Sequence, residues 1–258
     1  MTVQQVLDWL NALAPFESAE SFDNVGLLMG DAGAEVHTVL FGMDVTEELA
    51  REAASAGAEL IVTHHPFIFH ALKRIDYTGP QGRALCLLAR QRVSVIAAHT
   101  NWDKAPGGVS DALAQALGLS DIVRADDYLR IGELPSPLSP DAFAGLIANR
   151  LHIHARQYGA PSASLSRVAV AGGAYGEGYA LAASMGAQAF VVGEIRHHEL
   201  LDACARGLAV YDAGHFPTAL PGVKALYERF LADMVQTDKS VRAMLHATAP
   251  YPGALLAL

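Results

Sequence analysis

Apolar positions along the chain recur at helical spacing in some segments and form short β-rich runs in others, and this combination predicts an α/β protein. After Thr2 and Gln5, whose spacing is typical of a capping box, apolar residues recur at helical spacing up to Leu13 and predict a first helix. Further helices are predicted over residues 47–58, 81–91, 110–117, 139–151 and 215–235, with two more ending near residue 185 and starting at residue 197. Short β-rich runs predict strands over residues 36–44, 60–63, 93–98, 128–134, 168–171, 189–192 and 209–211. Strands that alternate with helices in this way favour βαβ units and parallel sheets.

The order of the predicted elements is shared by the two halves of the chain, although the residues barely repeat. Between the halves, Asp126-Asp127 and Pro135-Ser136-Pro137 bracket a short strand and mark a shift in composition. We therefore predict two linked α/β domains of similar topology, residues 1–125 and residues 126–258. The last helix or strand is free to pack back on the first domain.

The strand predicted over residues 60–63 runs directly into His64, His65 and Pro66. On a continuing strand the two histidines would point to opposite faces, so both serve one site only if the pleat ends at Thr63. Pro66 favours that ending because it keeps His65 out of the helical region. The alternative interpretation is a pair of hydrogen-bonded surface histidines.

Two other predicted strands also end on histidine. One reaches His99, with Asp103 four residues later, and another ends in Asp212-Ala213-Gly214-His215. The carboxyl ends of strands are where open α/β sheets place their ligands. Imidazole and carboxylate together suit zinc and similar metals, so these strand ends predict a metal site.

Composition narrows the classes of partner. The chain has 258 residues, 52% of them hydrophobic and 17% charged, with a formal net charge of −9. This charge disfavours nucleic acid and anionic membranes as partners. No apolar run approaches the roughly 18 residues of a membrane span, and the start of the chain lacks the basic residues of a signal peptide. We expect a cytoplasmic protein, in which Cys86 and Cys204 are inert core thiols.

A glycine-rich turn occupies residues 172–178, between a predicted strand and a helix. Its backbone amides could cradle a phosphate, or the segment could be a plain tight turn. The absence of a following Lys-Ser or Lys-Thr pair favours the tight turn.

Five ordered blocks of the sequence resemble the signature blocks of the GTP cyclohydrolase 1 type 2 family, also called Nif-three-like proteins. They are residues 21–27 (Ser-Phe-Asp-Asn-Val-Gly-Leu), 63–75 (from Thr-His-His-Pro to Lys-Arg-Ile), 99–103 (His-Thr-Asn-Trp-Asp), 193–198 (Gly-Glu-Ile-Arg-His-His) and 212–215 (Asp-Ala-Gly-His). The resemblance spans nearly the whole chain. It implies a dinuclear metal site in the cleft between two α/β domains and a toroidal hexamer.

The resemblance also implies roles for individual residues. The metal ligands are expected to be His64, His65, Asp103 and His215, and His99 contributes as a ligand or supports them. The family carries a glutamate four residues after the last histidine, whereas this chain has Ala219 there. Because Ala219 has no ligand atom, we expect one ion rather than two per chain. Two other carboxylates, Glu194 and Asp212, lie near strand ends and are candidates to replace the glutamate.

Two functions follow from the resemblance. The first is a metal-dependent hydrolase that acts on a nucleotide or a similar small molecule, with zinc, manganese or iron as the divalent transition metal and with His99 and Glu194 as catalytic residues that move protons. The second is a metal-binding or regulatory protein without turnover, which Ala219 favours. The apolar segment 251–258 is expected to pack against a neighbouring subunit of the oligomer.

Overall fold

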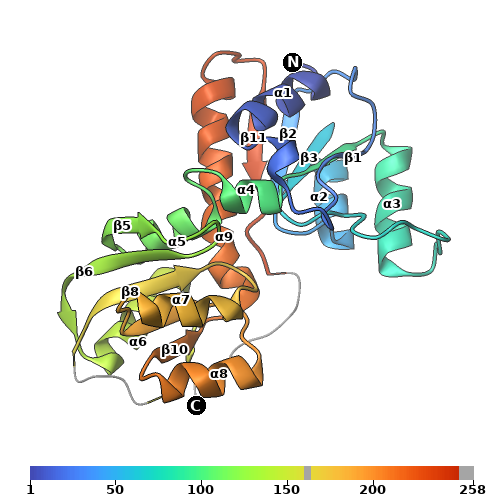
Figure 1. The fold of residues 1–258 in the computed structure, drawn as a ribbon. Helices are drawn as coiled ribbons and strands as arrows, with labels where there is room; N and C mark the ends of the chain where they lie inside the picture. Colours follow the sequence, from blue (N-terminus) through green and yellow to red (C-terminus); the bar gives the residue numbers. More distant parts are fainter. Residues whose placement is uncertain (160–163, 250–258) are drawn as a thin grey trace. The chain divides into compact units, whose positions relative to one another are not determined.

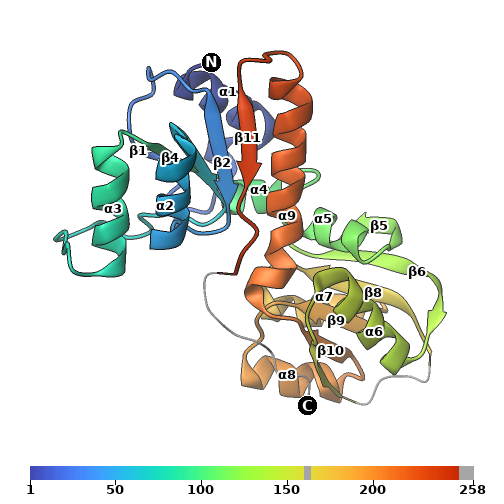
Figure 2. The same ribbon diagram turned by 180° about the vertical axis from the view of Figure 1, so that it is seen from behind.

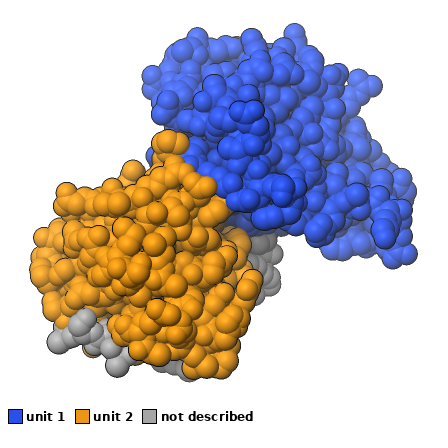
Figure 3. All heavy atoms as spheres, in the orientation of Figure 1, with its two compact units in different colours: residues 1–105, 223–251 blue, residues 106–222, 252–258 orange. Residues whose placement is uncertain are grey.

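The computed structural model describes residues 1–159 and 164–249, so the predicted subunit contact of segment 251–258 lies outside the described residues. The chain divides into two compact units (Figure 3). The described part of unit 1 comprises residues 1–105 and 223–249, and that of unit 2 comprises residues 106–159 and 164–222. Within these ranges, no helix combines the length and the hydropathy needed to cross a bilayer.

Unit 1 is built on a sheet with the strand order β1-β4-β3-β2-β11 (Figure 1). The strands are β1 (Gly26–Met29), β2 (Thr38–Gly42), β3 (Leu60–Thr63), β4 (Ser94–Ala97) and β11 (Arg242–Leu245). The helices are α1 (Val3–Leu13), a 3-10 turn at Phe16–Ser18, α2 (Glu47–Ala56), α3 (Pro80–Arg90) and the short α4 (Thr100–Lys104). Strands β11, β2, β3 and β4 run parallel, and β1 is antiparallel to β4.

Local sequence explains the elements that position the site in unit 1. Every residue of β2, β3 and β4 is buried, as expected for parallel strands covered on both faces. Helix α2 begins where the Thr46 hydroxyl accepts a hydrogen bond from the amide of Leu49, and it ends at Gly57, whose φ of 63° is left-handed. The predicted capping box of Thr2 and Gln5 is present at α1.

Unit 2 contains a sheet with the strand order β5-β6-β8-β9-β10-β7, seen from behind in Figure 2. Its strands are β5 (Ser120–Arg124), β6 (Arg130–Leu138), β7 (Arg156–Tyr158), β8 (Leu165–Ala171), β9 (Ala189–Val192) and β10 (Ala209–Asp212). Its helices are α5 (Val109–Ala116), α6 (Pro140–Leu151), a 3-10 turn at Gly176–Gly178, α7 (Tyr179–Ser184) and α8 (His197–Ala205). Helix α9 (His215–Phe230) starts in unit 2 and continues into unit 1, where a π-helical segment, Leu231–Val235, follows it.

The two units share the topology of a four-stranded core. In unit 1 a helix (α1) and an antiparallel strand (β1) precede three parallel strands joined by helices, and β1 pairs with the last of the three. In unit 2, α6 and β7 precede β8, β9 and β10, and β7 pairs antiparallel with β10. The prediction of two α/β domains with similar topology is confirmed.

The division between the units lies after Ala105, whereas the sequence placed the junction after residue 125. Residue 125 falls in the loop between β5 and β6, which pair antiparallel in the same sheet. The aspartates and prolines that suggested a linker therefore belong to a hairpin and to the strand that follows it. Strand β11 pairs with β2, so the end of the described chain belongs to unit 1.

Candidate metal centre

Three imidazoles gather at the carboxyl edge of the sheet in unit 1. His64 and His65 follow β3, and His99 follows β4. The ring centroids are 5.0 Å apart for His64 and His65, 5.1 Å for His64 and His99, and 5.4 Å for His65 and His99. Each ring offers one nitrogen, and these three atoms lie within 4.8 Å of one another, a spacing at which they could hold a metal ion.

The backbone after β3 explains how two adjacent histidines reach one site. The amides of His64 and His65 donate to the carbonyls of Gly42 and Met43, so the chain still follows the end of β2. The Thr63 hydroxyl donates to the carbonyl of His65 at 2.9 Å, which bends the chain at the point where the pleat ends. Both side chains therefore face the same edge, as the sequence predicted.

Nδ1 of each of the three imidazoles lies within hydrogen-bond distance of an oxygen atom of its own. Nδ1 of His64 lies 3.0 Å from the carbonyl oxygen of Ala98, Nδ1 of His65 lies 2.7 Å from Oδ1 of Asp44, and Nδ1 of His99 lies 2.9 Å from Oδ1 of Asp23. Carbonyl and carboxylate oxygens only accept hydrogen bonds, so in the neutral rings the proton sits on Nδ1 and the lone pair on Nε2. This is the arrangement by which outer oxygens orient metal-binding histidines.

Asp103 supplies a carboxylate beside the three rings. It lies on α4, one helical turn after His99, and its Oδ1 is 3.6 Å from Nε2 of His64. Burial raises the pKa of Asp103 to about 7, while the positive charge that His99 and His65 carry when protonated acts in the opposite direction. A bound cation would compensate for the burial of this carboxylate and favour its ionised form.

Two further aspartates, Asp23 and Asp44, contact histidines of the site, although neither was predicted as a ligand or a catalytic residue. The Asp23 side chain is 0% exposed and accepts hydrogen bonds from the backbone amide and hydroxyl of Thr100 as well as contacting His99. Burial by itself would raise the pKa of Asp23, but the hydrogen bonds of His99 and Thr100 hold it well below its ordinary value. The signal for Asp23 was its place in the block of residues 21–27, and that for Asp44 was its position at the end of the strand predicted over residues 36–44.

The predicted residues of unit 2 form a pair of their own. His215 is the first residue of α9, and its Nδ1 lies 2.7 Å from Oε1 of Glu194, which follows β9. The ring packs closely over Gly173, where a Cβ atom would lie 3.3 Å from Nε2 of His215. Gly173 has a φ of 67°, a left-handed conformation that glycine adopts without strain.

The structure thus brings His64, His65 and Asp103 together with His99 in unit 1, and His215 together with Glu194 in unit 2. Ala219 lies one turn after His215 on α9 and is 1% exposed. The other replacement candidate, Asp212, accepts a hydrogen bond from the amide of Gly214 at 3.2 Å.

The glycine-rich turn after β8 uses its first amides internally. The amide of Gly172 donates to the Ser110 hydroxyl at 3.2 Å, and the amide of Gly173 donates to the Thr218 hydroxyl at 3.1 Å. The carbonyl of Gly173 accepts hydrogen bonds from the amides of Gly193 and Glu194. These bonds fit the tight-turn interpretation rather than a phosphate cradle.

The donor set of unit 1 fits a transition metal. Three imidazole nitrogens and one carboxylate make a mixed nitrogen and oxygen set that suits Zn²⁺, Mn²⁺ or Fe²⁺ better than the oxygen-only preference of Ca²⁺ or Mg²⁺. Fold and site together define a two-unit α/β protein with a histidine cluster that could hold a metal ion.

Comparison with known proteins identifies the family of this chain. The family model described as Duf34/NIF3 (NGG1p interacting factor 3) matches residues 1–252. The chain belongs to this family.

Relatives and solved structures agree with that assignment. A Streptomyces coelicolor relative named GTP cyclohydrolase 1 type 2 homolog is 36% identical over 233 residues, covering 85% of this chain and 82% of the relative. A Clostridium perfringens relative of the same name is 31% identical over 230 residues, covering 86% of this chain and 88% of the relative. The crystal structure of Staphylococcus aureus protein SA1388 has a TM-score of 0.90 at 27% identity and covers 99% of both chains. A Bacillus cereus protein related to NIF3 has a TM-score of 0.93 at 21% identity, again over 99% of both chains, and shows the shared fold.

Proposed function

We propose that the protein is a metal-dependent hydrolase that acts on a nucleotide or a similar small molecule. The observation that carries the proposal is the cluster of His64, His65 and His99, in which an oxygen acceptor holds Nδ1 of every ring and Asp103 lies beside them. The curated relatives are named GTP cyclohydrolase 1 type 2 homolog, so GTP is the first substrate to test.

The residues of unit 1 have separate roles in this proposal, as metal ligands, as groups that orient the ligands, and as a candidate proton carrier. His64, His65 and Asp103 hold the ion, and Asp44 and the Ala98 carbonyl orient the two histidines. A bound divalent metal supplies Lewis-acid chemistry and lowers the pKa of water at the site. His99, oriented by Asp23, either completes the ligand set or moves a proton at Nε2.

The residues of unit 2 enter the proposal through the family resemblance. His215 is the predicted fourth ligand, and Glu194 is a predicted proton carrier. Its carboxylate lies against His215, so it supports that ring in either case.

The test is GTP consumption by the purified protein with saturating zinc or manganese. The proposal expects turnover in the wild type, loss of turnover and of bound metal in His64→Ala, and retention of both in Arg150→Ala, which changes an exposed residue of unit 2.

Metal analysis of His99→Ala separates the two possible roles of His99. Loss of turnover with full metal content assigns His99 to proton transfer, and loss of metal assigns it to the ligand set.

A second candidate function is metal binding without turnover. Ala219 favours it, because this residue has no ligand atom and its side chain is buried where the family carries a glutamate. Metal that binds stoichiometrically and depends on His64, together with no consumption of GTP or of other nucleotides, would support this function over the hydrolase.

A further inference from the structure

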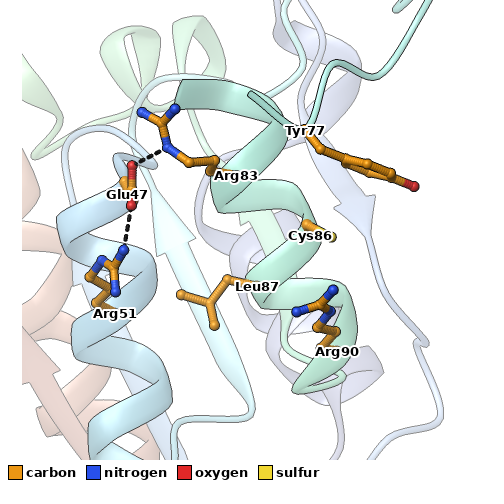
Figure 4. A pocket seen from close by; sticks show the side chains of 7 residues that line it. All are labelled: Glu47, Arg51, Tyr77, Arg83, Cys86, Leu87 and Arg90. Atoms are coloured by element: carbon orange, nitrogen blue, oxygen red, sulfur yellow. Dashed lines mark hydrogen bonds and ion pairs between the residues drawn. The ribbon is translucent and has the colours of Figure 1, made fainter. Parts of the chain in front are cut away.

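A groove with three arginines lies between α2 and α3 of unit 1, on a part of the chain that the metal centre does not use (Figure 4). Its volume is about 290 Å³, and its lining includes Glu47, Arg51, Tyr77, Arg83, Leu87 and Arg90. In Figure 4 the guanidinium groups of Arg83 and Arg90 lie towards opposite ends of α3. The Leu87 side chain lies between them and points towards α2.

Helical spacing explains why these side chains share one groove. Glu47 and Arg51 are four residues apart on α2, and Arg83, Leu87 and Arg90 follow one another at intervals of four and three residues on α3. Residues at these intervals lie on the same face of a helix. The two faces meet across the groove, and Tyr77 comes from the loop that precedes α3.

The groove is positively charged on a chain that is negative overall. Glu47 accepts hydrogen bonds from Arg51 at 2.5 Å and from Arg83 at 2.7 Å. The hydrogen bond from Arg83, followed by that from Arg51, lowers the pKa of Glu47 below its ordinary value, so the carboxylate is ionised. Among the described residues, the Arg90 side chain has no hydrogen-bond or ion-pair partner. Three guanidinium groups against one carboxylate leave two positive charges in the groove, although the net charge of the chain is −9.

These charges match one chemical group well. A phosphate monoester carries about −1.5 to −2 charges at neutral pH, and guanidinium groups bind its oxygens through paired N–H donors. The Leu87 side chain forms an apolar wall, and the Tyr77 ring, 67% exposed, offers a face on which a planar group could stack.

We infer that the groove between α2 and α3 binds a small phosphate monoester that carries a planar ring, with Arg51 and Arg83 on the phosphate, Arg90 adding positive charge along the groove and Tyr77 on the ring. This site is separate from the metal centre and does not depend on the proposed hydrolase activity. Glu47 holds Arg51 and Arg83 in place before the ligand arrives, and it competes with the phosphate for the same donors.

The test is calorimetric titration of the full-length, metal-free chain with AMP at low ionic strength. Removing the metal prevents a phosphate from binding through an ion at the histidines. We expect saturable binding below about 1 mM AMP. Arg83→Ala should weaken binding about tenfold or more, because it removes a charged donor. Arg90→Ala should weaken binding less, because it removes a positive charge from the groove without removing a direct contact. Arg150→Ala, on α6 of unit 2, should bind AMP as the wild type does.

Two further variants test the details of the inference. Glu47→Gln should tighten AMP binding several-fold, because an amide holds the guanidinium groups less strongly than a carboxylate does. Tyr77→Ala should weaken the binding of AMP but leave that of inorganic phosphate unchanged. Circular dichroism spectra that match the wild type would show that each variant is folded.

The opposite results would overturn the inference. Absence of AMP binding below several millimolar, or equal binding by the wild type and Arg83→Ala, would show that the groove is not a phosphate site. Inorganic phosphate that binds as tightly as AMP would remove the role of Tyr77 and of the planar ring.

Discussion

The carboxylate of Glu194 lies 2.7 Å from Nδ1 of His215, which gives the histidine of unit 2 the same kind of oxygen contact as the three histidines of unit 1. Asp44 makes this contact to His65, and Asp23 makes it to His99. The shared topology explains the likeness, since β9 and β10 correspond to β3 and β4. Glu194 follows β9 as His65 follows β3, and His215 follows β10 as His99 follows β4.

The first prediction concerns this contact. If His215 is a metal ligand, Glu194→Ala should weaken metal binding about 10- to 100-fold, because it removes the group that orients the ring and fixes its tautomer. Metal affinity measured by competition with a coloured chelator tests this. Glu177→Ala, another exposed acidic residue of unit 2, is the matched control and should keep wild-type affinity. Equal affinities for the two variants would show that Glu194 does not support metal binding through His215.

The second prediction concerns Asp44, which the sequence did not assign to the site. Asp44→Ala should weaken metal binding to a similar extent, because the carboxylate holds Nδ1 of His65 at 2.7 Å. Asp44→Asn keeps an oxygen acceptor at this position and should recover part of the affinity. A loss of affinity that is identical in Asp44→Asn and Asp44→Ala would show that charge, rather than orientation, is the contribution of Asp44.

The histidines at the strand ends were predictable because each follows a buried β-rich run in the sequence. Buried runs such as residues 60–63 lead straight into histidines, and the carboxyl ends of parallel strands share one edge of a sheet. His64, His65 and His99 therefore come together as expected. The helical turn that carries Asp103 was not predicted, since five residues are too short to show a helical period.

The contacts that orient the histidines were harder to predict. Asp23 lies 76 residues from His99 in the sequence, and Asp44 lies 21 residues from His65, so their pairing depends on the order of the strands. The domain boundary was missed for a related reason. Polar and proline residues mark a hairpin as readily as a linker, and only the pairing of β5 with β6 distinguishes the two.

The third prediction concerns assembly. We propose that the chain forms a toroidal hexamer, as the family resemblance implies, and that the ring survives removal of the metal because apolar interfaces rather than ligands hold the subunits. Light scattering before and after treatment with a chelator measures this. A monomer in both states would contradict the proposed assembly, whereas a ring that dissociates with the chelator would show that metal binding stabilises the interface.

The fourth prediction concerns the number of ions. Ala219 leaves no ligand atom one turn after His215, so elemental analysis of the purified chain should find nearer one ion than two. A glutamate at this position would lie on the same helical face as His215 and could reach the same ion. Ala219→Glu should therefore raise the metal content towards two ions and increase any GTP turnover.

The burial of Ala219 makes a stability measurement informative as well. The side chain is 1% exposed, so an ionised glutamate there loses its hydration and should lower the melting temperature by several degrees when metal is absent. Added zinc should restore more of this loss in Ala219→Glu than in Ala219→Gln, because only the carboxylate brings a negative charge to the ion. Both variants have nearly the same size, so a difference between them reports ligation rather than packing. Equal responses to zinc would show that position 219 does not reach the metal, and two ions already bound to the wild type would show that another carboxylate has replaced the missing one.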